Sequence, residues 1–183
     1  LPHNVYASMP LGAEMHSLAA MTLIGGEDGW WWGGLIGKGL TGSCSLWAAA
    51  LLGGWFARTF GRWSGWSAAA LLLATPGNAH VAMAGLIDMV LAAYLCAAVI
   101  VTTMLWPKLR IGTANFGDGL LMGLTAGGAA ACKYPGLVLV VVPIVFSAGW
   151  AMCLTRRWHS SLRVLAAIGL GLLLTCAPWY AKN

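Results

Sequence analysis

Residues 123–153 read GLTAGGAAACKYPGLVLVVVPIVFSAGWAMC, in which Lys133-Tyr134-Pro135 separates two apolar runs. The run at 136–153 contains no charged residue, and the glycine-rich run at 117–131 precedes it. Such runs favour helices in a bilayer, because lipid offers no partner for backbone N–H and C=O groups and each segment must satisfy its own. We therefore interpret the two runs as a helical hairpin that crosses a membrane twice, with Lys133 at its turn.

The rest of the chain has the same apolar character. Hydrophobic residues make up 60% and charged residues 8% of the 183 residues, and the mean hydropathy is +0.78. A soluble domain carries about 25% charged residues, so the composition excludes an ordinary water-soluble fold. The chain contains four further apolar runs: three precede the hairpin, at 33–57, 64–79 and 85–105, and one follows it, at 164–177. The sequence therefore predicts an all-α fold, a polytopic transmembrane helical bundle of about six spans.

The apolar run at 10–24 differs because it is short and contains Glu14 and His16. It has fewer residues than the roughly 20 that a helix needs to span a bilayer. We interpret it as an interfacial or re-entrant helix that packs over the outer ends of the spans. The chain begins at Leu1 rather than Met and stops just after an apolar run. We therefore expect 1–183 to be part of one membrane-embedded domain, incomplete at both ends, with the transmembrane bundle at 33–178.

The basic residues indicate how the spans are oriented. They are sparse and lie between apolar runs, so the net charge of +5 does not indicate a nucleic-acid partner. Cytoplasmic loops carry an excess of Lys and Arg. Seven of the ten basic residues fall in alternate loops, namely Arg58, Arg62, Lys108, Arg110, Arg156, Arg157 and Arg163. We therefore predict a multi-pass protein of the plasma (inner) membrane, with these loops on the cytoplasmic side.

Charged residues at the outer ends of the spans are the candidates for a site. Lys38, Asp88 and Lys133 all fall toward the outer leaflet, and Glu14 and His80 lie on the same face. A charge in hydrocarbon costs about 2.5–3.5 kcal/mol on insertion scales, so such residues line a cavity or pair with one another. We expect an outward-facing polar pocket that binds an anion such as a lipid phosphate. Two alternatives are snorkelling to the interface and a Lys38–Asp88 ion pair that locks two helices.

No set of residues in the sequence indicates a metal or a cofactor. His3, His16 and His80 lack the spacing of a metal site, and the five cysteines show no CxxC pairing. The sequence has no serine or cysteine nucleophile with a paired histidine. We expect neither a metal nor a cofactor.

The glycines of the 117–131 run predict close helix packing. Gly119, Gly123 and Gly127 recur at four-residue spacing and so fall on one face of a helix, as Gly33 and Gly37 do in another run. Small residues at this spacing let membrane helices approach closely. No P-loop lysine follows these glycines and no strand precedes them, which argues against a phosphate loop.

Several short motifs occur in an order that resembles a known family. They are Ser8-Met9-Pro10-Leu11, Lys38 at the opening of a span, Ala84-Gly85-Leu86-Ile87-Asp88, GLTAGGAAACKYPGLVLVVVP at 123–143 and APWYAKN at 177–183. In these residues and their order the chain resembles GT-C-type membrane glycosyltransferases of glycosyltransferase family 39, the relatives of protein O-mannosyltransferases and of the lipid A aminoarabinose transferase.

The resemblance implies a transferase that uses a polyprenyl-phosphate-linked sugar at the extracytoplasmic face. The charges and the topology predict Lys133, Lys38, Asp88, Glu14 and His80 as substrate-binding residues, and the resemblance places functional residues near Asp88 and Lys133. It also implies a catalytic acidic residue upstream of this chain. The expected partners are the bilayer, the sugar donor and an acceptor that is a protein, a lipid or a glycan. The alternative is a non-enzymatic membrane protein such as a transporter or assembly factor. A transporter predicts inverted repeats, and the sequence shows no internal repeat.

Overall fold

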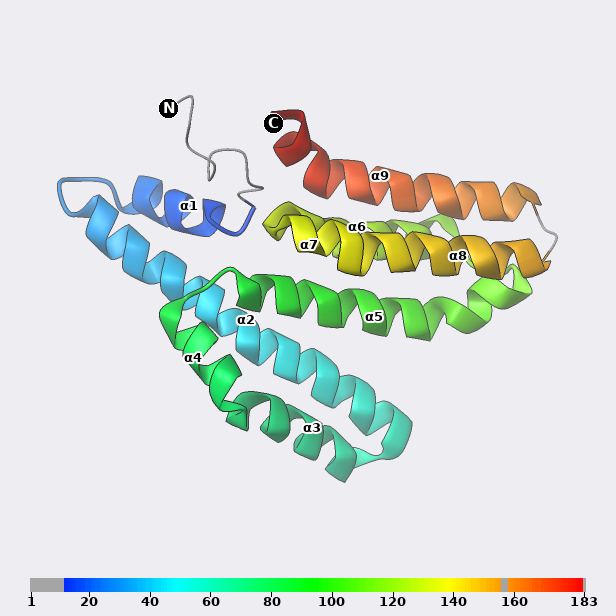
Figure 1. Ribbon diagram of the computed structural model, residues 1–183, viewed down its shortest axis with the longest axis horizontal. Helices are drawn as coiled ribbons and strands as arrows, with labels where there is room; N and C mark the ends of the chain where they lie inside the picture. Colours follow the sequence, from blue (N-terminus) through cyan, green and yellow to red (C-terminus); the bar gives the residue numbers. More distant parts are fainter. Residues whose placement is uncertain (1–11, 156–157, 183) are drawn as a thin grey trace. The chain divides into compact units, whose positions relative to one another are not determined.

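A computed structural model describes residues 12–155 and 158–182 of the chain. His3, Pro10, Arg156 and Arg157 lie outside these residues. Within them the structure is helical and contains no strand, which confirms the all-α prediction (Figure 1). The elements are α1 (Met15–Ile24), α2 (Gly29–Phe60), α3 (Arg62–Ala74), α4 (Pro76–Ala84), α5 (Asp88–Ile111), α6 (Phe116–Cys132), α7 (Tyr134–Gly136), the π-helical η2 (Leu137–Val141), α8 (Val142–Thr155) and α9 (Trp158–Lys182).

Four helical stretches of the described chain are long and apolar enough to cross a membrane. They are α2, α5, the continuous stretch Tyr134–Leu154 and the part of α9 at Ser161–Ala181. Large apolar side chains point outward from these helices; for example, Trp47 is 67% exposed and Phe146 is 70% exposed. Water disfavours contiguous apolar surface of this kind, whereas lipid accommodates it. The chain is therefore a membrane protein.

The predicted single span at 64–79 is wrong, because two helices occupy it. Helix α3 ends at Ala74, Thr75 is extended with ψ 116°, and Pro76 opens α4. A proline disfavours helical backbone at the residue before it. The 13 residues of α3 reach about 20 Å, since an α-helix rises about 1.5 Å per residue. That is less than the roughly 30 Å of a hydrocarbon core.

Two other prolines lie inside helices that continue beyond the apolar runs predicted at 85–105 and 164–177. Pro107 lies inside α5 and Pro178 inside α9. Each lies close to the end of its helix, and membrane helices tolerate the loss of a backbone hydrogen bond when neighbouring groups re-satisfy the freed carbonyl. Helix α5 ends instead at Gly112, which has a φ of +70°. The N–H of Gly112 donates to the carbonyl of Leu109, and the N–H of Thr113 donates to that of Lys108, which is a Schellman motif.

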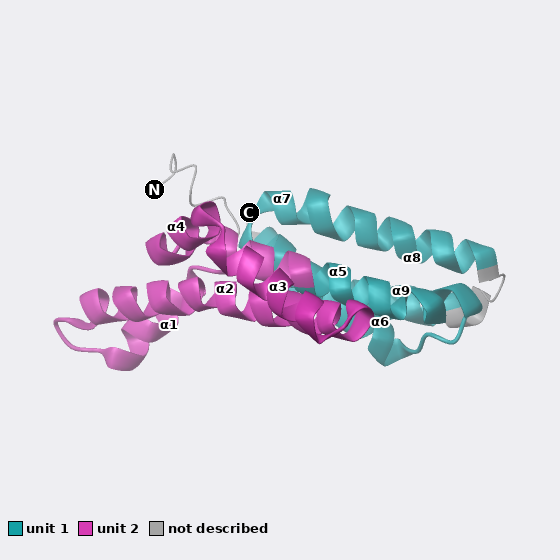
Figure 2. Ribbon diagram, turned by 90° about the horizontal axis from the view of Figure 1, so that it is seen from below, with its two compact units in different colours: residues 1–10, 97–183 teal, residues 11–96 magenta. Residues whose placement is uncertain are grey.

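The chain divides into two compact units, coloured separately in Figure 2. One is formed by residues 11–96 and is called unit 2 here; the other contains residues 97–183 and is called unit 1. The division falls within α5. In unit 2, helices α1, α3 and α4 each pack against α2. In unit 1, the closest packing is between α6 and α9.

The predicted glycine face of α6 is confirmed as the contact with α9. A Cβ atom added at Gly123 would meet the carbonyl oxygen of Ile168, and one added at Gly119 would lie 2.5 Å from the carbonyl oxygen of Val164. The contacts advance in the same direction along both helices, from Gly119 with Val164 to Gly123 with Ile168, so α6 and α9 run parallel. The contact surrounds Met122 and Ile168, which are almost completely buried. The hydrophobic effect does not drive helices together in lipid. Van der Waals contacts between closely approaching backbones therefore stabilise the α6–α9 pair.

One end of unit 1 brings together helix ends that the predicted order of spans places on one side of the membrane. Leu109 of α5, Met152 of α8 and Val164 of α9 line one small cavity, so the end of α5, the end of α8 and the start of α9 meet at one end of the unit (Figures 1 and 2). Lys108 and Arg163 lie next to these residues in sequence. Two of the predicted cytoplasmic basic groups therefore lie at the same end of unit 1.

Candidate functional site

The five predicted site residues fall into both units. Glu14, Lys38, His80 and Asp88 lie in unit 2, and Lys133 lies in unit 1. The four in unit 2 are exposed, and Lys133 is half-buried. We describe the two groups one after the other.

Lys38 lies where two other helices meet α2. On one face of α2, a Cβ atom at Gly37 would collide with Ser17 of α1. On an adjacent face, a Cβ atom at Gly42 would lie 2.6 Å from the carbonyl oxygen of Ala82 in α4. The stretch 37–42 of α2 therefore serves as a junction for α1 and α4, and Lys38 is its charged residue.

The turn between α4 and α5 lies directly against Lys38. Gly85 ends α4 in the left-handed conformation, with φ 65° and ψ 36°. Its N–H donates to the carbonyl of Ala82, and the N–H of Leu86 donates to that of Val81, each at 3.1 Å. A Cβ atom at Gly85 would lie 2.9 Å from both Cβ and Cγ of Lys38. Glycine is thus needed for its backbone conformation and for the space that Lys38 occupies.

The same turn leads to Asp88, the first residue of α5. A carboxylate in the first turn of a helix interacts favourably with the positive end of the helix dipole. The motif at 84–88 therefore places an anionic side chain three residues after the backbone that contacts Lys38. A cation and a carboxylate at one junction can together bind a phosphate and hydroxyl groups, since the first attracts anions and the second accepts hydrogen bonds.

Glu14 and His80 lie on the helices that flank this junction. Glu14 precedes α1 at its N-cap position, and its side chain makes no capping hydrogen bond. It lies one helical turn before Ser17, the residue opposite Gly37. His80 lies in the middle of α4 and is exposed. Both side chains are therefore accessible near the helices that meet at Lys38.

Lys133 lies at the tip of the hairpin between α6 and α7, which confirms the predicted turn. Its backbone is extended, with φ −164° and ψ 147°, and its carbonyl accepts a hydrogen bond of 2.8 Å from the N–H of Gly136. The Tyr180 hydroxyl donates to the carbonyl of Ala130 at 3.3 Å, and the rings of Tyr180 and Tyr134 pack edge to face at 5.7 Å. The backbone around Lys133 is thus anchored to α9.

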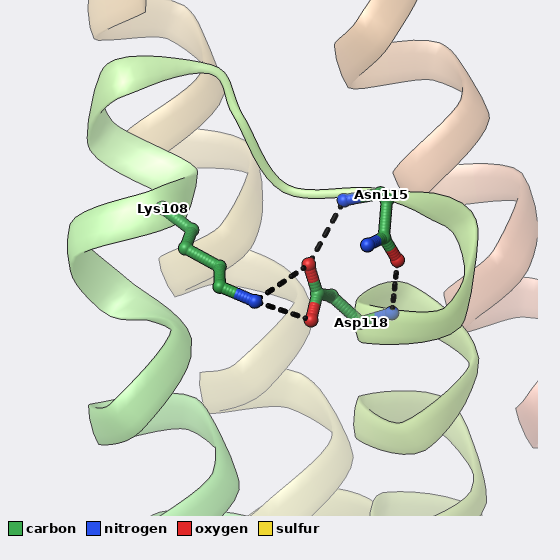
Figure 3. Close-up of polar contacts among 3 residues, drawn as sticks. All are labelled: Lys108, Asn115 and Asp118. Carbon is green, nitrogen blue, oxygen red and sulfur yellow. Dashed lines mark hydrogen bonds and ion pairs between the residues drawn. The ribbon is translucent and has the colours of Figure 1, made fainter.

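A polar cluster at the N-terminal end of α6 was not predicted from the sequence. The Asp118 carboxylate accepts the Asn115 N–H at 3.0 Å, the Asn115 side chain accepts the Asp118 N–H at 3.0 Å, and Lys108 donates to Asp118 (Figure 3). Asn-x-x-Asp before an apolar run has the form of a capping box, and this spacing could have revealed it. Because the cluster lies at the opposite end of α6 from Lys133, we assign it a structural role.

Two large grooves of the described chain lie elsewhere. Two grooves, of about 570 Å³ and 630 Å³, run along the α2–α3 hairpin, and neither is lined by Lys38, Asp88 or Lys133. Among the residues that the structure describes, no group of three or more His, Cys, Asp or Glu side chains could hold a metal. The chain matches no family model, no curated protein and no solved structure.

Proposed function

We propose that this chain forms part of a multi-pass glycosyltransferase of the plasma (inner) membrane. It would transfer a sugar from a polyprenyl-phosphate-linked donor to an acceptor at the extracytoplasmic face. The observation that carries the proposal is the contact of Lys38 with the Gly85 turn, which leads directly to Asp88. This junction supplies a cation nine residues after the start of α2 and a carboxylate at the start of α5, and together they would face the phosphate of the donor.

Each residue has a physical role in the proposed reaction. The lipid phosphate is the leaving group, and its developing negative charge is stabilised by fixed cations in a site shielded from water. Lys133 is the first candidate for this contact and Lys38 the second. Asp88 orients Lys38 or accepts hydrogen bonds from sugar hydroxyls. The general base that deprotonates the acceptor is the acidic residue that the family resemblance implies upstream of this chain.

A transporter is the second candidate, and it is favoured by interrupted helices. Transporters bind substrate at discontinuous helices. In this chain Thr75 separates α3 from α4 within the 64–79 segment, and the π-helical segment η2 lies within the helical stretch from α7 to α8. A transporter would move the lipid-linked sugar or another solute without cleaving it. The two candidates therefore differ in whether the bond between sugar and phosphate is broken.

The proposal is tested with the full-length protein in proteoliposomes that contain a polyprenyl-phosphate hexose labelled in the sugar. With a membrane extract added as the source of acceptor, we expect the sugar to pass to the acceptor and polyprenyl phosphate to be released. Lys38→Ala should slow this release by about tenfold or more, as loss of one electrostatic contact to a transition state does. Arg110→Ala is the matched control, because Arg110 is an exposed cation at the end of α5, in the part of that helix assigned to unit 1. Transbilayer movement of the intact donor without cleavage would favour the transporter instead.

A further inference from the structure

The α2–α3 hairpin of unit 2 contains a groove that the proposed transfer reaction does not use. It measures about 570 Å³ and lies between α2 and α3. Small residues of α2 form much of its lining, among them Ala50, Gly54 and Ala57, and Trp66 of α3 forms part of the opposite wall. Arg62 completes the lining at the end where the two helices are joined. The groove is therefore apolar along its length and cationic at one end.

The cationic end has no counter-ion in its own part of the sequence. Arg58 lies in the last turn of α2 and Arg62 begins α3, so two guanidinium groups flank the short connection at Gly61. The sequence from 29 to 87 contains no Asp or Glu. An anion that neutralises these arginines therefore comes from outside helices α2, α3 and α4.

The aromatic residues beside Arg62 indicate the depth of this end in the membrane. The Arg62 guanidinium carbon lies 5.4 Å from the centre of the Trp63 ring. Trp63 is 76% exposed and Trp66 is 66% exposed. Exposed tryptophans of membrane helices prefer the headgroup level. The cationic end of the groove therefore lies at the headgroups, and its alanine and glycine lining extends from there along the hydrocarbon.

We propose that this groove binds an anionic glycerophospholipid of the surrounding leaflet. Its phosphate contacts Arg62, and one acyl chain lies against Ala50, Gly54 and Ala57. The charge of the lipid complements the two arginines, and its chain fills the apolar space between α2 and α3. The inference does not rest on sugar transfer, because it concerns a different set of residues.

The chain offers a matched pair of variants for this test. A side chain added at Gly54 meets open space and fills the groove, whereas one added at Gly39 of the same helix meets open space outside it. The full-length protein is purified in nanodiscs of phosphatidylcholine with a minority of phosphatidylglycerol and of polyprenyl phosphate. The lipids that stay bound are identified by native mass spectrometry. Wild type and Gly39→Leu should retain phosphatidylglycerol, and Gly54→Leu should lose it.

A charge variant tests the headgroup contact separately. Arg62→Gln should lower the preference for phosphatidylglycerol over phosphatidylcholine about fivefold, the effect expected for one arginine near an anionic surface. Retention of phosphatidylglycerol and phosphatidylcholine by wild type in the same proportion as in the nanodisc would overturn the proposal. So would retention of phosphatidylglycerol by Gly54→Leu at the level of Gly39→Leu. Specific loss of polyprenyl phosphate instead of phosphatidylglycerol from Gly54→Leu would contradict the assignment to a glycerophospholipid.

Discussion

The Nζ atom of Lys108 lies 3.0 Å from the Oδ1 atom of Asp118, and this ion pair joins the last turn of α5 to the first turn of α6. The partners differ in exposure, since the Lys108 side chain is 49% exposed and that of Asp118 is 12% exposed. Asp118 also accepts the Asn115 N–H. The Asp118 carboxylate therefore takes part in the capping box and in the ion pair, whereas the Lys108 ammonium group takes part in the ion pair.

Asp118→Ala should lower the free energy of unfolding by about 1–2 kcal/mol, because it removes the carboxylate that accepts the Asn115 N–H in the capping box as well as the ion pair. Lys108→Ala should cost at most about 1 kcal/mol, since its half-exposed charge is screened by solvent. Unfolding of the purified protein in mixed micelles, followed by far-ultraviolet circular dichroism, measures both. The account of this turn fails if the lysine variant is the less stable of the two.

The contact between α6 and α9 predicts opposite outcomes for two glycines of α9. A Cβ atom at Gly171 would lie 2.6 Å from the backbone nitrogen of Leu124, whereas one at Gly169 meets nothing within 4 Å. Gly171→Ala should destabilise the protein by roughly 1–3 kcal/mol through overpacking. Gly169→Ala should leave the melting temperature unchanged or raise it, because alanine favours a helix over glycine by about 1 kcal/mol. Equal melting temperatures for the two variants would contradict the contact.

Gly85 predicts a coupled effect on folding and on the candidate site. Gly85→Ala should cost about 1–2 kcal/mol for the left-handed backbone alone, and its methyl group would also displace Lys38. Gly77→Ala of α4 is the control, because a Cβ atom there meets open space. Thermal unfolding measures the first effect. The second should appear as weaker binding of polyprenyl phosphate by Gly85→Ala, with Gly77→Ala equal to wild type.

The distribution of basic residues predicts the sidedness of the spans. Single cysteines introduced at Arg58 and Lys108 in a cysteine-free background should be labelled only from the cytoplasmic side. Cysteines at His80, Lys133 and Trp179 should react with an impermeant reagent added to intact cells. Labelling of position 108 from outside would invert the assignment, because that loop belongs to the predicted cytoplasmic set.

The sequence predicted the fold class and the packing faces better than it predicted the ends of the helices. The glycine spacing of Gly119 and Gly123 gave the correct contact face, because a four-residue repeat fixes one side of a helix. Proline gave mixed results. Pro76 separates α3 from α4, but α5 continues through Pro107 to Ile111. The cost of a proline depends on whether the freed carbonyl finds another partner, which one-dimensional patterns do not contain.

The local structure around the candidate site residues was predicted in part. The hairpin turn at Lys133 follows from the polar tripeptide between two apolar runs, and the structure confirms it. The contact of Lys38 with Gly85 could not be predicted, because it depends on how α4 folds back along α2. Asp118 was overlooked because it lies inside an apolar run, where its capping partner Asn115 was not considered. The turn could therefore be predicted from local residue spacing. The contact between Lys38 and Gly85 depends on tertiary packing and could not.

Binding of polyprenyl phosphate by the full-length protein tests the central claim most directly. Native mass spectrometry of the wild type, Lys133→Ala, Lys133→Arg and the control Arg110→Ala gives the dissociation constants. The account predicts that Lys133→Ala weakens binding about tenfold, the effect of one charge-assisted contact of roughly 1.5 kcal/mol. Lys133→Arg should restore most of the affinity, and all variants should express and insert nearly normally. Unchanged affinity in Lys133→Ala, with lower expression, would contradict the account and assign Lys133 a structural role.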